Sequence, residues 1–113
     1  MSQNVYVRSG FTRNILPQDT VTTTVTGDWM FKDAPQVSFQ AVVSGTGSVG
    51  ATVVFDVSND GVNACTTTLG TITLTGTTVN SDGFTTSAPW KYVRARVTAI
   101  SGTGAIVNVY ACA

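Results

Sequence analysis

Apolar and polar side chains alternate along five segments of this chain, and that alternation constrains its fold more than any other feature. The segments are residues 20–27, 37–43, 52–58, 69–76 and 91–100. A period of two residues places successive side chains on opposite faces of a β-strand. Thr and Val dominate these runs, and both are β-branched residues that fit a pleated surface better than a helix. The sequence therefore predicts an all-β protein.

Short clusters of Gly, Asn, Asp and Ser separate the alternating runs. They are Ser-Gly-Thr-Gly at 44–47 and 101–104, Asn-Asp-Gly at 59–61, Thr-Gly-Thr-Thr at 75–78 and Ser-Asp-Gly at 81–83. Such residues supply positive φ or bond to their own backbone in turns. About seven or eight short antiparallel strands separated by turns predict a single β-sandwich, with jelly-roll topology the favoured subclass.

Two stretches repeat one pattern, residues 34–58 and 88–113. Each begins with Ala-Pro, continues as an alternating run, reaches Ser-Gly-Thr-Gly and ends in a second alternating run. Proline belongs at the start or the edge of a strand because it cannot donate a ladder hydrogen bond. The pattern predicts two β-hairpins, each turning at its Ser-Gly-Thr-Gly.

The first 18 residues are less regular than the rest of the chain. At 113 residues the protein is long enough for one domain, and we expect a strand and arm at 1–18 and the sandwich domain at 19–113. The arm contributes four candidate partner contacts: Phe11, Arg13, Ile15 and Leu16. Two apolar residues after an arginine have no evident place in the sandwich's alternation, so they are candidates for a neighbour's surface; burial in the core is the rival explanation.

The charge balance gives no sign of a nucleic-acid or membrane partner. Six basic and six acidic residues give a formal net charge of zero, whereas binding to phosphates or anionic lipids favours a basic patch. Near-neutral proteins tend to associate, which favours a component of an assembly. The N-terminus lacks a secretory signal and no run approaches a membrane span, so we expect synthesis in the cytoplasm.

The chain has few residues suited to catalysis. It contains neither His nor Glu, which removes the usual general base and the commonest metal ligand. We predict no catalytic residue, cofactor or metal, with a calcium site at Asn59, Asp60 and Asp82 as the alternative. Cys65 and Cys112 lie in no metal-binding spacing; we expect two small, buried or half-buried apolar side chains, although one disulfide is arithmetically possible.

Aromatic and arginine side chains complete the candidate partner contacts. They are Trp29, Phe31, Trp90, Arg94 and Arg96. Tryptophan rings at a sandwich edge can stack on sugars or anchor a protein partner, and the rival explanation is that they close the ends of the core. Arg94, Arg96 and Tyr92 alternate to one face of their strand. That face is either open to solvent, or its guanidinium groups pair with a carboxylate such as Asp56 across the sheet or on a partner.

Residues 51–112, which include "LGTITLTGTTVNSDGFTTSAPWKYVRARVTAISGTG", resemble small virion proteins of tailed bacteriophages that serve as head decoration (cement) proteins. The resemblance implies a β-sandwich or jelly roll on the capsid exterior, bound as a dimer or trimer to the major capsid protein, which it stabilises without enzymatic activity. A tail or connector component is an alternative. A second similarity, carried by Ser58–Gly61 and Tyr92–Arg94, is to discoidin-like galactose-binding sandwiches, and it implies a carbohydrate-binding module.

Overall fold

The structure is a computed structural model that describes residues 5–7, 12–16, 21–32 and 34–113. These residues form seven strands in one sheet and no helix, which confirms the all-β class. The strands are β1 (Val5–Val7), β2 (Thr12–Asn14), β3 (Val25–Thr26), β4 (Met30–Lys32), β5 (Val37–Ser58), β6 (Gly70–Thr86) and β7 (Tyr92–Cys112).

Three long strands make up most of the sheet. β5, β6 and β7 contain 22, 17 and 21 residues, and β5 lies between the other two, antiparallel to both. The order across the sheet is β1-β4-β7-β5-β6, with β1 and β4 parallel and with β2 and β3 also pairing with β7. The sheet is open and mainly antiparallel. A sandwich of short strands is not confirmed, because the described strands belong to one continuous sheet.

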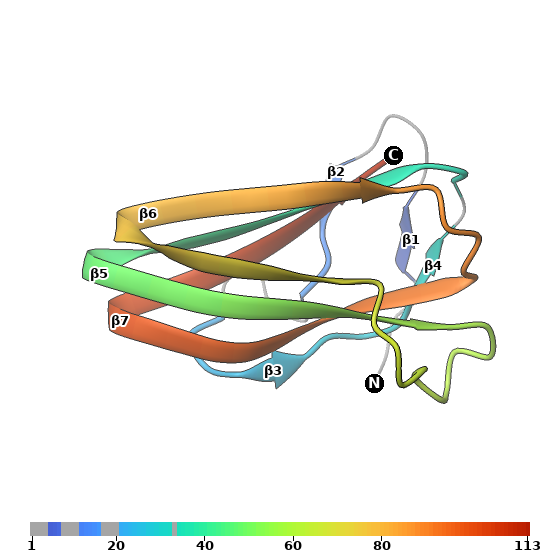
Figure 1. The fold of residues 1–113 in the computed structure, drawn as a ribbon, viewed down its shortest axis with the longest axis horizontal. Coiled ribbons are helices and arrows are strands. Elements are labelled where there is room, and N and C mark those ends of the chain that lie inside the picture. Colours follow the sequence, from blue (N-terminus) through green and yellow to red (C-terminus); the bar gives the residue numbers. More distant parts are fainter. Residues whose placement is uncertain (1–4, 8–11, 17–20, 33) are drawn as a thin grey trace.

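Each long strand folds back on itself at the same end of the molecule (Figure 1). In β5 and β7 the bend lies at the Ser-Gly-Thr-Gly segments, which are neighbours in the sheet because Thr46 pairs with Thr103. β6 bends beside them, where Thr77 pairs with Ser48. Gly47, Gly102, Gly104 and Thr78 all have positive φ, the conformation that sharp bends require and that glycine adopts at little cost.

The two repeated stretches are not hairpins, and that prediction was wrong. The arms on either side of each Ser-Gly-Thr-Gly pair with the other stretch: Val43 lies opposite Val107 and Val53 opposite Val97. The repeat therefore reflects two paired strands that must bend at the same place.

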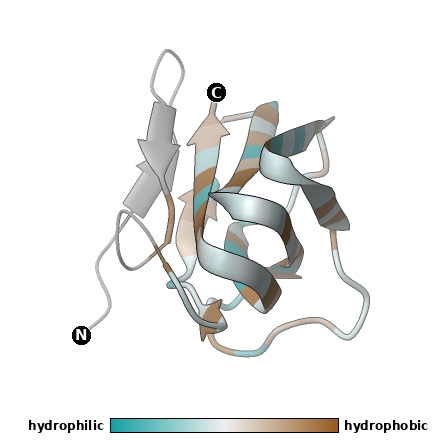
Figure 2. Ribbon diagram, turned by 90° about the vertical axis from the view of Figure 1, so that its left-hand side faces the viewer, coloured by the Kyte–Doolittle hydropathy of each residue, from teal (hydrophilic) through white to brown (hydrophobic). Residues whose placement is uncertain are grey.

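The core lies between the two layers of arms. Phe39 and Phe55, which come from opposite arms of β5, have ring centroids 4.7 Å apart, and the ring of Phe84 from β6 lies 5.4 and 5.2 Å from them. Apolar and polar residues alternate along the long strands (Figure 2). The alternate positions predicted to face inward are buried, as at Val93, Ala95 and Val97 on β7.

Segments from the N-terminal third pair with the side of β7 that β5 leaves free. Ile15 N–H donates to the Val109 carbonyl, and Val21 exchanges two backbone hydrogen bonds with Val107. The side chains of Ile15, Leu16 and Val21 are buried in the core. In this way the chain's own N-terminal segments line the β7 side of the sheet.

Candidate binding surface of aromatic and arginine side chains

The outer face of β7 carries a row of large polar side chains. Tyr92, Arg94 and Arg96 are half-buried and alternate with the buried residues Val93 and Ala95. This follows from the period-two geometry of a strand: the three side chains share one face because they are two residues apart.

Asp56 of β5 holds both arginines in place. It lies opposite Arg94 in the register, and its Oδ2 accepts hydrogen bonds from Arg94 Nε and Arg96 Nε, both at 3.0 Å, while Oδ1 accepts from Arg96 Nη2 at 3.1 Å. The Asp56 side chain is 4% exposed, against 23% for Arg94 and 37% for Arg96. Of the alternatives that the sequence left open for this face, the structure shows the pairing with Asp56 across the sheet, so the guanidinium groups are held by their own chain.

The ionised form of Asp56 is favoured despite its burial. Burial by itself raises the pKa of this carboxyl, but the hydrogen bonds and positive charges of Arg96 and Arg94 outweigh that effect and hold the pKa below its ordinary value. The hydrogen bond with Asp56 in turn raises the pKa of Arg96. The three groups form a charge-assisted network with one net positive charge.

Aromatic rings extend the arginine row. The Arg94 guanidinium carbon lies 4.5 Å from the centroid of the Trp29 ring, within the range of a cation–π interaction. Phe31 of β4 contacts Tyr92 with ring centroids 5.6 Å apart, and Lys91 Nζ lies 5.9 Å from each of these two rings. We call Trp29, Phe31, Tyr92, Arg94 and Arg96 the aromatic–arginine cluster.

The structure brings together four of the predicted contact residues: Trp29, Phe31, Arg94 and Arg96. Trp90 is half-buried and packs against the core. Ile15 and Leu16 are buried at 6% and 7% exposure, so the core accounts for both side chains in the isolated chain.

Two predicted contacts have no described side chain, and one member of the cluster, together with the lysine beside it, was not predicted as a contact. Phe11 lies outside the described residues, and Arg13 is described through its backbone, which pairs with Ala111. Tyr92 and Lys91 were not among the predicted contacts. The alternation that places Tyr92 beside Arg94 was the signal for the first, whereas nothing local connects Lys91 to Phe31.

The loop after β5 is built around Asp60. Its Oδ1 accepts hydrogen bonds from Ser58 Oγ and from the backbone N–H groups of Val62 and Asn63, and Oδ2 accepts from the Asn63 amide. These bonds, that of Ser58 first, lower the pKa of Asp60. Asn59 Oδ1 accepts from the Lys91 N–H. Within the alternative calcium site, the Asp60 oxygens thus serve the loop's own turn, the Asn59 oxygen bonds the backbone before β7, and Asp82 lies apart on β6, opposite Ala41.

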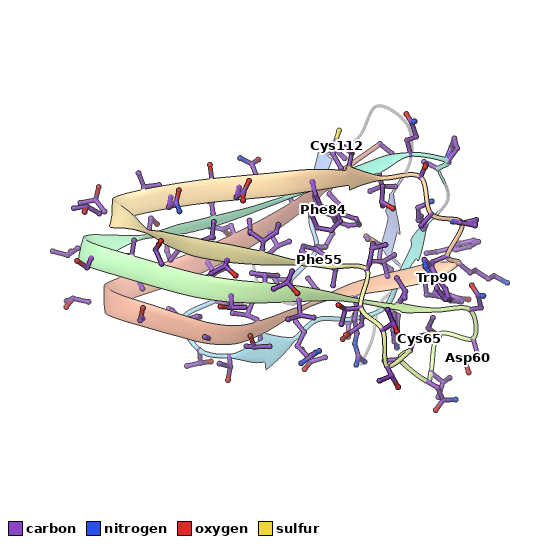
Figure 3. All side chains as sticks on the ribbon, in the orientation of Figure 1. Phe55, Asp60, Cys65, Phe84, Trp90 and Cys112 are labelled. Atoms are coloured by element: carbon purple, nitrogen blue, oxygen red, sulfur yellow. The ribbon has the colours of Figure 1, made fainter. Side chains whose placement is uncertain are left out.

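Cys65 and Cys112 are both free and half-buried, as expected, and they lie in different parts of the molecule (Figure 3). Cys65 packs against the core as a small, weakly polar side chain. In the part of the chain that the structure describes, no helix is long and apolar enough to cross a membrane.

Comparisons of the chain with protein-family models, with curated proteins and with solved structures found no match.

Proposed function

We propose that this chain is a non-enzymatic structural protein of a tailed-bacteriophage virion. Made in the host cytoplasm, it binds the outer surface of the assembled capsid, contacts the major capsid protein and stabilises the shell. The resemblance of residues 51–112 to head decoration proteins supports this proposal. In the same proposal, the two layers of arms act as a compact β-sandwich that sits on the shell.

The aromatic–arginine cluster is the observation that carries the proposal. Trp, Tyr and Arg are the residues most enriched among those that dominate protein–protein binding energy. Asp56 already fixes Arg94 and Arg96 at 3.0 Å, so little side-chain entropy remains to be lost on binding. Arg94 also covers one face of the Trp29 ring, which favours a protein contact over a sugar stacked on that ring.

The test uses capsids of the encoding phage assembled without this protein. Purified protein is mixed with them, bound protein is measured by co-sedimentation, and shell resistance is measured by thermal disruption. We expect saturable binding and a higher disruption temperature. The double variant Trp29→Ala/Phe31→Ala should bind at least about tenfold more weakly, because truncating central aromatic residues commonly costs more than 1 kcal/mol.

Val79→Ser is the matched control. Val79 is 57% exposed and lies opposite Ser44 at the bend of β5, whereas Tyr92 of the cluster lies opposite Ser58 at the far end of that strand, so capsid binding should not change. Failure to bind, or binding without a gain in thermal resistance, would contradict the proposal. Saturable binding to a glycan array that is lost in the double variant would favour the carbohydrate-binding alternative.

A further inference from the structure

β6 forms one edge of the sheet, and its first arm, residues 70–76, leaves backbone groups unpaired. Among the described strands β6 pairs with β5 alone. Its sequence contains no Lys or Pro, the residues with which proteins commonly protect an edge. The opposite side of the sheet differs, because β2, β3 and β4 pair there with β7. A row of backbone donors and acceptors that no described strand pairs therefore remains on the β6 side.

The contacts of this arm show which backbone groups point outward. Gly27 N–H donates to the Ala95 carbonyl, so Ala95 of β7 directs its backbone groups away from β5. Its partner Phe55 therefore directs its own groups away from β7 and toward β6. Leu69 N–H, just before β6, also donates to the Phe55 carbonyl, but the register partner of Phe55 is Gly70, so the direction of Leu69 does not continue into the arm. In an antiparallel ladder the direction alternates along each strand, so Val53 and Ala51 also point at β6, toward their partners Ile72 and Leu74.

It follows that Thr71, Thr73 and Thr75 direct both N–H and C=O away from β5. The Thr75 carbonyl agrees with this assignment, since it accepts a hydrogen bond from the Asn80 side-chain amide at 2.8 Å. The same three threonines are exposed, whereas Ile72 and Leu74 are 3% and 1% exposed. The outward edge is thus uncharged and lined with hydroxyls.

The arm reads almost the same in both directions: Gly-Thr-Ile-Thr-Leu-Thr-Gly. We propose that this edge pairs with the same edge of a second copy of the chain, antiparallel and centred on Thr73, to form a two-fold symmetric dimer. Thr73 then lies opposite Thr73 of the other copy, Thr71 opposite Thr75, and Ile72 opposite Leu74. Every pair joins like with like.

The hydrogen-bond directions fit this arrangement. A two-fold axis at Thr73 makes the outward-facing residues 71, 73 and 75 the hydrogen-bonded positions of the new ladder, and β5 uses none of these groups. The Thr75 carbonyl already accepts from the Asn80 amide, and its second lone pair accepts the Thr71 N–H of the other copy. Threonine pairs across antiparallel strands are favourable, and no like charges meet, since β6 carries a single charged residue, Asp82. A self-complementary patch is what a closed two-fold interface requires. A strand from a different protein could also pair with this edge, but the near-palindromic sequence of residues 70–76 would then play no part, so the symmetry favours a second copy of this chain.

Charge complementation at Thr73 tests the dimer. Mass is measured by analytical ultracentrifugation over a wide concentration range for the full chain, for Thr73→Lys, for Thr73→Glu and for an equal mixture of these two variants. We expect a dimer for the unaltered chain and at least about tenfold weaker association for each variant alone, because like charges then face each other at the axis. The mixture should form a heterodimer.

Thr103→Lys is the matched control, since Thr103 is exposed but lies in the bend of β7 and away from the β6 edge; this variant should remain a dimer. Circular dichroism checks that each variant keeps its sheet. A monomeric unaltered chain, open-ended fibres, or dimers that persist in both Thr73 variants would overturn the proposal. The dimer is measured without capsids, so its failure would leave the capsid proposal standing, and the reverse also holds.

Discussion

At the scale of single residues, Asp56 is the side chain on which the outer face of β7 depends. It is buried and accepts three hydrogen bonds from two arginines. We expect Asp56→Asn to lower the free energy of unfolding by about 2 kcal/mol at pH 7, because Arg94 and Arg96 lose their counter-charge and repel each other. Urea denaturation measures this loss.

The contribution of Asp56 depends on pH in a direction that its pKa fixes. Its pKa is lower in the folded chain than the ordinary value of 3.8, so the stabilisation is present above that pH and is lost as the pH falls through the folded value. The difference in the free energy of unfolding between the unaltered chain and Asp56→Asn should therefore shrink below about pH 4. Asp82→Asn, an exposed control on β6, should change stability by less than about 0.5 kcal/mol. A difference in unfolding free energy between the unaltered chain and Asp56→Asn that stays constant down to pH 2 would contradict this account.

At the scale of elements, the bends in the long strands depend on glycine to different degrees. Gly102 has a φ of 118°, and a Cβ there would lie 2.7 Å from the Ser48 carbonyl oxygen; Gly47 has a φ of 73° with open space around it. We expect Gly102→Ala to lower the free energy of unfolding by about 3 kcal/mol and Gly47→Ala by about 1 kcal/mol, since the second substitution carries backbone strain without a clash. Equal losses in chemical denaturation would show that contacts at the bend do not matter.

The sequence predicted the strands and their inner faces because these depend on local alternation, as at Val93, Ala95 and Val97. It also suggested the pairing of Asp56 with the arginines, because Asp56 lies on the polar face of its alternating run and Arg94 and Arg96 lie on the polar face of theirs. It did not predict that the arms around each Ser-Gly-Thr-Gly pair with the other stretch. Register between distant strands depends on long-range contacts such as that of Val43 with Val107, which no local pattern reveals. In addition, a Gly-rich segment is compatible either with a hairpin or with a bend that carries the same strand into a second layer.

At the scale of the whole molecule, β5, β6 and β7 each contribute an arm to both layers, so we expect the two layers to unfold together. Phe55, fully buried, contacts Phe39 from the other arm of its own strand and Phe84 from β6. We expect Phe55→Ala to lower the free energy of unfolding by about 4 kcal/mol, while unfolding remains a single transition seen alike by far-ultraviolet circular dichroism and tryptophan fluorescence. Val62→Ala, at a side chain that is 74% exposed, should have little effect.

Hydrogen exchange gives the sharper measurement of this coupling. The amides of Val43 and Val53 lie in opposite arms of β5. In the unaltered chain, and again in Phe55→Ala, the two amides should exchange with one and the same free energy, that of global unfolding. If Phe55→Ala accelerated exchange at Val53 but not at Val43, the layers would be separate cooperative units, and the continuity of the strands would not couple them.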